Sequence, residues 1–563
     1  MANICVDATT IEIVGNLLLS IAEETGVALI KSAYSSNIKE RHDCSCAIFD
    51  AKGNLVAQAE HIPMHLGSML DSIQAILGRY PRDSIMEGDM FIANDPYKGG
   101  GSHLPDIVFA APVFADGQMI GWVANIAHHS DIGGIVPGST SGDVTSIFQE
   151  GLRLPAVRVV REGNPIQEIL EIIIGNCRTP QERIGDLNAQ MAANRIGIVR
   201  MKEAYRKYGQ SLIEAMMQLQ DYAENSLRAA IAKIPDGTYH AVDLVDDMEN
   251  LDQQICIDVV ITVQGSDIIL DFSQSSDQVP ANINVTYGGL MATVFYTIKA
   301  MIGPHIPSNS GIYRVFKVIA RPGSVVNAVE PGPIGERMST CQRVVEAIFK
   351  AFYPVLEKNV MACSHDGGTS VNLSGVNPAT GRFFVYPEGI AGGEGARWNR
   401  DGMSGVQVHM TNTSNQPIEV LEMETPLLVD AYALRKDSGG PGEFRGGLGI
   451  ERRIRVLADD VRFVGHGGRQ FLPAWGLAGG GAGAVGGFYR ICADGREERL
   501  SSVCTSAVFN KNDVLRILTP GGGGFGDPKR RSHEAVQRDL AEGKISLQAA
   551  LDIYGYTPGE DVP

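Results

Sequence analysis

The chain has 563 residues, of which 44% are hydrophobic and 20% are charged, and it carries a formal net charge of −17. Single hydrophobic cores stop growing near about 250–300 residues, so this length predicts several domains, each with its own core. The acidic balance, without any block of lysine or arginine, excludes nucleic acid as the main partner.

The opening stretch MANICVDATTIEIV lacks the basic and continuous apolar regions of a signal peptide. The nine cysteines are irregularly spaced, and no run reaches about 18 uninterrupted apolar residues, the length of a membrane span. We therefore expect a cytoplasmic protein with free, mostly buried thiols and no membrane partner.

Residues 1–180 are predicted to form an N-terminal α+β unit that binds a metal. Apolar residues recur at helical spacing between 9 and 34, where TTIE is a typical helix start. CSCAIFDAKGNLVAQAEH (44–61) is typical of a strand, a turn and a second strand. Further strands are predicted at GDMFIANDP (88–96), DIVFAAPVF (106–114) and MIGWVANIAHH (119–129).

Four further segments follow along the chain. Residues 181–236 show long helical periodicity with a break near Tyr208 and Gly209, and we interpret them as a helical spacer. Residues 237–370 form a middle α+β unit with helices at 288–302 and 340–356, and residues 371–530 form a β-rich unit. A tail, 531–563, carries one helix over 533–555. The fold class is α+β and multi-domain, with mixed sheets, the spacer and a glycine-punctuated C-terminal half.

The 65 glycines are unusually many and cluster in the C-terminal half. AGGGAGAVGG (478–487) is predicted to be a flexible loop, and the other runs serve turns and close backbone approaches. Neither this run nor TPGGGGFGDP (519–528) has the Lys-Ser or Lys-Thr of a P-loop or lies between a strand and a helix. No nucleotide site is therefore predicted in this chain.

Three glycine-punctuated stretches carry histidines and aspartates that could bind a metal ion: RHDCSC (41–46), NDPYKGGGSHLPD (94–106) and IAHHSDIGG (126–134). They bring Asp43, His103, Asp106 and a histidine pair to strand ends or adjacent loops. Imidazole and carboxylate ligands together suit Zn²⁺, Mn²⁺ or Fe²⁺. The alternative is that these are hydrogen-bonded loop histidines and turn aspartates.

His129 and Asp131 follow the first histidine of that pair. They are candidates to orient a metal-binding histidine or to take a proton from water, and an ordinary Asx turn is the alternative for Asp131. His61 and His65 are candidates to line the same pocket, and packed histidines are the interpretation that we favour. Cys44 would need a base and an orienting group to act as a nucleophile, and the sequence reveals neither.

These residues lie in blocks that resemble the hydantoinase B/oxoprolinase family. ERHDCSCAIFDAKGNLVAQAEHIPMHLGSM, GDMFIANDPYKGGGSHLPDIVFAAPVF, AHHSDIGGIVPGS, CRTPQERIGDLNAQMAANRIG, SGGPGEFRGGLGI and PGGGGFGDP follow the family's order through essentially the whole chain. The resemblance implies a B-type subunit of an ATP-dependent hydrolase of hydantoins, 5-oxoproline or lactams. It also implies an A-type ATPase partner that binds the ATP, in a hetero-oligomer such as α2β2.

Carried over residue by residue, the family's metal ligands fall on Asp43, His103, Asp106 and His128. The resemblance implies a divalent transition metal, with zinc expected and manganese or iron as alternatives. In the mechanism that it implies, the partner phosphorylates the amide oxygen. Metal-bound hydroxide then attacks the activated carbon, with His129 or Asp131 taking the proton. Related subunits serve ketone carboxylases, which is the alternative function, and a scaffold for the ATPase is a third.

Overall fold

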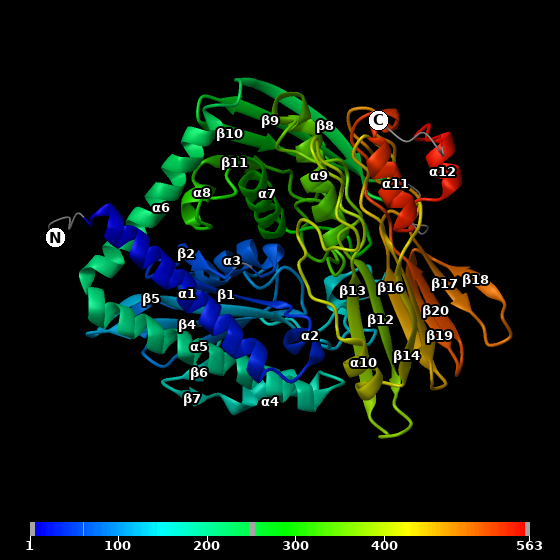
Figure 1. The fold of residues 1–563 in the computed structure, drawn as a ribbon. Helices are drawn as coiled ribbons and strands as arrows, with labels where there is room; N and C mark the ends of the chain where they lie inside the picture. The colour runs from blue at the N-terminus through cyan, green and yellow to red at the C-terminus, as the bar shows by residue number, and fades with distance from the viewer. Residues whose placement is uncertain (1–5, 60, 141, 247–253, 558–563) are drawn as a thin grey trace.

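The chain builds four β-sheets, and helices cover the first two of them (Figure 1). The computed structural model describes residues 6–59, 61–140, 142–246 and 254–557. The first five residues of the predicted N-terminal unit and the last six of the tail lie outside the described residues, as does the end of the strand expected at 237–247. The α+β, multi-domain class predicted from the sequence is confirmed.

The first sheet holds the predicted N-terminal strands and is antiparallel throughout. Its order is β2-β1-β5-β4-β3-β6-β7, with bounds Leu55–Gln58, Cys44–Asp50, Gln118–His128, Asp106–Ala115, Met90–Ala93, Val157–Arg161 and Asn164–Pro165. Strand β1 is buried along its whole length. Such continuous apolar strands are expected when helices cover both faces of a sheet.

One face of this sheet packs against α1 (Ala8–Ser32) and α5 (Pro180–Tyr208), and the other against α3 (Pro63–Arg79). Helix α1 is long and apolar enough to pass a length-and-composition test for a membrane span. Its residues Val14, Leu18 and Ile21 are nevertheless buried in a core shared with α6 (Gln210–Ile231) and β1. Packing inside the fold therefore accounts for the apolar residues on this face of the helix.

The predicted spacer consists of two helices, α5 and α6, which break at Gly209 as expected. The φ of Gly209 is 54°, a left-handed value that glycine adopts without strain. Helix α5 covers β4 and β5, and α6 runs from the first sheet toward the second along one side of the molecule (Figure 1). The boundaries of the five predicted segments stay predictions.

The second sheet has the order β11-β10-β9-β8, with bounds Phe316–Ile319, Asp267–Asp271, Cys256–Gln264 and Gly237–Leu244. It is mixed, because β10 and β11 run parallel while the other pairs are antiparallel. Helices α7 (Tyr287–Ile302) and α9 (Met338–Leu356) match the two predicted in this region. They pack with this sheet into the largest core of the protein.

The C-terminal half contains two antiparallel sheets that face each other. Their orders are β13-β12-β16-β19 and β14-β15-β20-β17-β18. The strand bounds along the chain are Thr369–Val376, Phe383–Ile390, Leu427–Leu434, Ile450–Val456, Val461–His466, Gly487–Ile491, Glu497–Leu500, Val503–Phe509 and Val514–Leu518 for β12 to β20. Leu373 and Phe463 of one sheet share a core with Ile454 and Leu515 of the other. This is a β-sandwich.

The glycine runs stack backbone against backbone beside the sandwich, which corrects the prediction of a flexible loop at 478–487. Within this stack Gly481, part of the 478–487 stretch, donates its N–H to Pro441 O at 2.6 Å, and Gly440 N–H donates to Gly522 O at 2.8 Å. A Cβ added at Gly446 would overlap the Gly522 carbonyl oxygen. Glycine is used here because the chains lie too close for any side chain.

The remaining helices are short. Their bounds are Ser36–Lys39, Gln167–Gly175, Ser310–Tyr313, Ile418–Glu424, His533–Ala541 and Leu547–Asp552 for α2, α4, α8, α10, α11 and α12. The single tail helix predicted over 533–555 is wrong in one respect, because it is two helices. Gly543, with a φ of 70°, interrupts the helical pattern between them.

Candidate metal centre

Three neighbouring strand ends meet at one edge of the first sheet. Strand β4 begins at Asp106 and β5 ends at His128, and these two residues are direct cross-strand partners. Strand β1 begins one residue after Asp43, and His128 N–H donates to the Asp43 carbonyl at 2.9 Å. The antiparallel order β1-β5-β4 therefore places residues from distant parts of the chain side by side.

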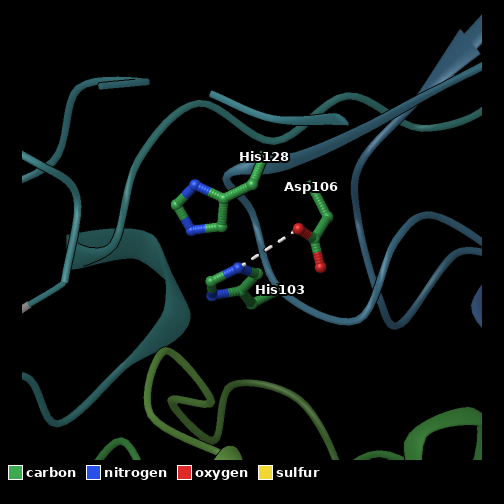
Figure 2. A group of neighbouring side chains, drawn as sticks. All are labelled: His103, Asp106 and His128. Carbon is green, nitrogen blue, oxygen red and sulfur yellow. Dashed lines mark ion pairs between the residues drawn. The ribbon is translucent and has the colours of Figure 1, made fainter. Parts of the chain in front are cut away.

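His103 reaches the same edge from the loop before β4. The Asp106 N–H donates to the His103 carbonyl at 3.1 Å, which closes a turn over the two intervening residues. His103 Nε2 lies 3.4 Å from Asp106 Oδ1, and the His103 and His128 ring centroids are 4.9 Å apart. Figure 2 shows the two rings and the carboxylate turned toward a common point.

Two buried atoms at this point lack a hydrogen-bond partner among the described residues: His103 Nε2 and Asp106 Oδ1. The other His103 nitrogen is fixed, because Nδ1–H donates to the Gly335 carbonyl at 3.0 Å. Its Nε2 lone pair therefore faces the carboxylate oxygen with no proton between them, an arrangement that costs free energy unless a cation lies between. One ligand atom each from His103, Asp106 and His128 lies within 4.8 Å of the others. This donor set fits a divalent transition metal.

Asp43 and His65 complete the ring of side chains. His65 Nε2 lies 3.4 Å from Asp106 Oδ1 and 3.9 Å from Asp43 Oδ1. Its Nδ1 lies 3.2 Å from the hydroxyl of Ser45, which also accepts the Ile62 N–H. Of the two interpretations of His65, the structure supports the one in which it lines the pocket, because the start of α3 places it beside both aspartates.

Arg337 is a functional neighbour that the sequence patterns missed. Its Nη2 donates to Asp106 Oδ2 at 3.1 Å, and its Nε donates to the Ser102 hydroxyl at 3.0 Å. Ser102 in turn donates to the same Asp106 oxygen at 2.7 Å. One carboxylate oxygen of Asp106 is thus held by donors, and the other is left to face the histidines. The segment 335–337 supports both His103 and Asp106 from more than 200 residues away in the sequence.

The electrostatics of the site favour the protonation states that a metal needs. Burial lowers the pKa of His128 to about 4, and burial together with Arg337 lowers the pKa of His103. Burial opposes ionisation of Asp106, but the neighbouring His103 and His65 outweigh it and hold its pKa well below the usual value. At neutral pH the site therefore presents neutral imidazoles and an ionised carboxylate.

His129 and Asp131 are not brought to this point. His129 Nε2–H donates to Gln190 Oε1 at 2.9 Å, and its Nδ1 accepts from Arg183, so both ring nitrogens are engaged on α5. Asp131 accepts from the backbone N–H groups of Gly133, Gly138 and Arg178 and pairs with the Arg178 guanidinium at 2.9 Å. Asp131 therefore shapes the loop that follows it, and Gly138 of that loop lines the site cavity.

The cavity beside the His/Asp cluster has a volume of about 130 Å³ and lies between the first sheet and the β-sandwich. Asp43, His65, His103, Asp106 and His128 line one wall. Arg41 lines it as well. The other walls come from the segment 335–338, from strands β12 and β13, and from residues 407–413; they include Glu336, Ser370, Asn372, Gln407, Thr411 and Thr413. Burial raises the pKa of Glu336, while a hydrogen bond with Ser370 opposes this rise. The cavity is small, polar and built from both halves of the chain.

Comparison with known proteins identifies the family. The profile of the family described as hydantoinase B/oxoprolinase matches residues 7–528. The chain belongs to this family. A protein assigned as the B component of a D-/L-hydantoinase from Pseudomonas sp. (strain NS671) is 32% identical over 98% of this chain and 95% of its own length. An uncharacterized protein of Methanocaldococcus jannaschii is 39% identical over 97% and 96%.

Two solved structures share the fold of this hydantoinase B/oxoprolinase family chain. The crystal structure of ATP-dependent caprolactamase from Pseudomonas jessenii has a TM-score of 0.92 and 29% identity, covering 99% of this chain and 98% of its own. A nucleotide-free acetone carboxylase structure has a TM-score of 0.91 and 20% identity, covering 98% and 79%. At that identity the second likeness concerns the fold alone.

The family chain uses neither of its two clustered cysteines as an exposed nucleophile. Cys44 and Cys46 are fully buried in β1, and burial raises the pKa of each thiol far above its ordinary value. A buried thiol with a raised pKa is unreactive. Their apolar packing against α1 and α5 explains why they are cysteines.

Proposed function

We propose that this chain is the metal-dependent B-type subunit of an ATP-dependent hydrolase that opens cyclic amides such as hydantoins, 5-oxoproline or lactams. The observation that carries the proposal is the pair of buried, unpartnered atoms, His103 Nε2 and Asp106 Oδ1, that face each other in a polar cavity. Membership of the hydantoinase B/oxoprolinase family supports the class of substrate. Relatives named as one component of a hydantoinase and of a caprolactamase support a partner subunit.

In this proposal the metal is held by His103, Asp106 and His128, with Asp43 as the fourth predicted ligand and His65 beside both carboxylates. A divalent cation bound there, zinc by expectation or manganese or iron, would act as a Lewis acid and lower the pKa of water toward about 7. Arg337 and Ser102 keep one Asp106 oxygen occupied, so the carboxylate presents its other oxygen in a fixed direction.

Proton transfer needs a group that His129 and Asp131 do not supply, because their polar atoms are engaged elsewhere. We assign it to Glu336, which lines the cavity between Gly335 and Arg337, the residues that hold His103 and Asp106. Burial raises its pKa, so its carboxyl exchanges a proton closer to neutral pH than an ordinary glutamate does.

ATP is assigned to an A-type ATPase partner, because this chain carries no P-loop or dinucleotide motif. The partner would phosphorylate the amide oxygen and so turn a poor electrophile into one with a good leaving group. The assembly would be a hetero-oligomer such as α2β2. In such an assembly the activated substrate reaches the His/Asp cluster without contact with bulk solvent.

The test is to produce the chain with its A-type partner and measure ATP turnover with 5-oxoproline, hydantoin, N-methylhydantoin and caprolactam. His103→Ala should remove both bound metal and turnover. His240→Ala, an exposed histidine on β8, is the matched control and should change neither. Full metal content and activity in His103→Ala would contradict the proposal. ATP turnover that needs a ketone and bicarbonate instead would assign the chain to a carboxylase.

A further inference from the structure

Arg41 is exceptional among the buried arginines of this protein. Among the described residues, each of the others has a carboxylate oxygen within 4.0 Å of its guanidinium, and Arg41 has none. The paired arginines are Arg183, Arg337, Arg343, Arg445, Arg452, Arg469 and Arg531. Arg41 is 4% exposed, as deeply buried as several of these. The fold therefore neutralises every other buried guanidinium and leaves this one.

The neutral partners of Arg41 hold it in place without satisfying it. Its Nη1 donates to Asn37 Oδ1 at 2.5 Å and to the Pro387 carbonyl at 3.0 Å, and its Nη2 donates to the Thr413 hydroxyl at 3.3 Å. Its Nε–H is buried and has no partner among the described residues. A guanidinium has five N–H donors in a planar fork, so the Nε side of this fork is unused.

A buried cation without a counter-charge costs several kcal/mol of stability, about what breaking a buried ion pair costs. A fold keeps such a group where an anion binds to it. The location agrees, because Arg41 lines the same cavity as the His/Asp cluster and lies two residues before Asp43.

The charges around the cavity point the same way. Three carboxylates of the lining, Asp43, Asp106 and Glu336, face two guanidiniums, and only Arg337 among these is paired with one of them, Asp106. Even with all three carboxylates ionised, a bound divalent cation would leave this set of groups net positive. Glu388 on β13 is already neutralised by Arg452, at 2.6 Å. The N-terminus of α9, a helix of 19 residues, begins at the cavity-lining Met338 and adds the positive end of its dipole.

We propose that Arg41, with the Thr413 hydroxyl beside it, forms a subsite for a phosphate group next to the metal centre. The fork of a guanidinium matches the oxygens of a phosphate, and Arg is the side chain best suited to bind that group in a buried place. This inference rests on the proposed function, in which the substrate arrives phosphorylated and phosphate is released. It adds to that function the residues that recognise the phosphate.

The experiment measures binding of inorganic phosphate by isothermal titration calorimetry. It uses the full chain, first freed of metal with a chelator and then loaded with Zn²⁺. Arg41→Gln should weaken phosphate binding about 10- to 100-fold in both states, the range expected for losing a hydrogen-bonded charge. Arg41→Lys should recover part of the loss. Arg200→Gln, which removes an exposed guanidinium from α5, is the control and should bind as the wild type does.

Arg41 also braces Asn37 and Pro387, so a second variant keeps the test independent of folding. Thr413→Val removes one hydroxyl and should weaken phosphate binding about 3- to 10-fold with unchanged circular dichroism. Acetate serves as the carboxylate arm, because a ring-opened product would carry a carboxylate, and it should bind at least 10-fold more weakly than phosphate.

Three results would overturn the subsite: no phosphate binding by the wild type, wild-type affinity in both variants, or acetate binding as tightly as phosphate. Phosphate binding by the chelated chain does not depend on the metal. The result for Arg41 is therefore independent of whether the proposed function is correct. The proposed function is tested by metal content and by ATP turnover in His103→Ala.

Discussion

The pKa of His128 predicts how the stability of the metal-free protein depends on pH. Burial is the main cause that lowers this pKa to about 4, and His103 and Arg41 lower it further, while Asp43 and Asp106 oppose the shift. The unfolded chain has an ordinary histidine pKa of about 6.5. Below about pH 6.5 the unfolded state therefore binds a proton that the folded state refuses. The stability contributed by His128 is complete above pH 6.5 and is lost as the pH falls toward 4.

The size of this effect follows from the shift. The difference between a pKa of about 6.5 and one of about 4 corresponds to about 3.4 kcal/mol, and the partial exposure of the ring to the cavity reduces this to about 2 kcal/mol. His128→Asn removes the titrating group but keeps a polar side chain. The chelated wild type should therefore lose about 2 kcal/mol more stability between pH 6.5 and 4 than the chelated variant does.

Two measurements check this prediction. Guanidinium unfolding followed by the fluorescence of the three tryptophans reports on global unfolding, and one of them, Trp122, is buried in β5, the strand that ends at the site. Hydrogen exchange of the peptides from β4 and β5, corrected for intrinsic exchange rates, reports on the same sheet edge. His365 and His409 also have pKa values lowered by burial, to about 4 and about 3, but both are present in both proteins and cancel. Parallel pH curves for the wild type and His128→Asn would refute the reasoning.

Two further predictions separate structural roles from catalytic ones. His129→Ala should leave the metal content unchanged and lower the free energy of unfolding by about 1–3 kcal/mol, measured by thermal unfolding. The reason is that it leaves the buried polar atoms of Arg183 and Gln190 without their partner. Loss of turnover with full stability would instead support His129 as the proton acceptor. Gly522→Ala should cost about 3 kcal/mol or more, because the added Cβ overlaps the Glu394 carbonyl oxygen. The control is Gly78→Ala on α3, where an added Cβ would meet open space, and it should be neutral or slightly stabilising. Equal melting temperatures for the two variants would contradict the close packing of the glycine runs.

Local patterns in the sequence predict the strands and helices of the N-terminal unit well, because those elements are amphipathic or continuously apolar. The strand-turn-strand over 44–61 and the strands at 106–114 and 119–129 are confirmed as β1, β2, β4 and β5. Helix α3 is not predicted, since the stretch that leads into it and forms its first turn, HIPMHL (61–66), has two histidines and a proline and shows no helical period. The tail was predicted as one helix because periodicity continues past Gly543, and only the backbone conformation of that glycine reveals the break.

The conformation of the glycine runs also cannot be predicted from local sequence patterns. A run such as AGGGAGAVGG is compatible with a flexible loop, a phosphate-binding loop or a close-packed backbone. These three differ only in what lies across from the glycines. Here the neighbours are other glycine runs, distant in the sequence, and Gly524 N–H donates to Gly481 O at 2.9 Å. No spacing within one run contains that information.

The candidate metal centre likewise combines residues that the sequence could select with residues that only the tertiary structure reveals. Asp43, His103, Asp106 and His128 lie at strand ends, so sequence spacing and the resemblance could both select them, and the structure brings the last three together. Their metal-binding role stays a prediction that elemental analysis tests. Two residues that hold them, Arg337 at Asp106 and Gly335 at His103, come from the second half of the chain.

The role of Arg41 can be inferred only from the tertiary structure, because its cavity lies between two halves of the chain. In the sequence it is one of 48 lysines and arginines, and an arginine two residues before an aspartate suggests an ordinary local ion pair. In the folded protein Arg41 instead reaches Pro387 and Thr413, and no carboxylate lies within 4.0 Å of its guanidinium among the described residues. The two halves therefore have to meet before Pro387 and Thr413 can hold the guanidinium of Arg41 at the cavity. Separating them should abolish phosphate binding even if each half kept its secondary structure.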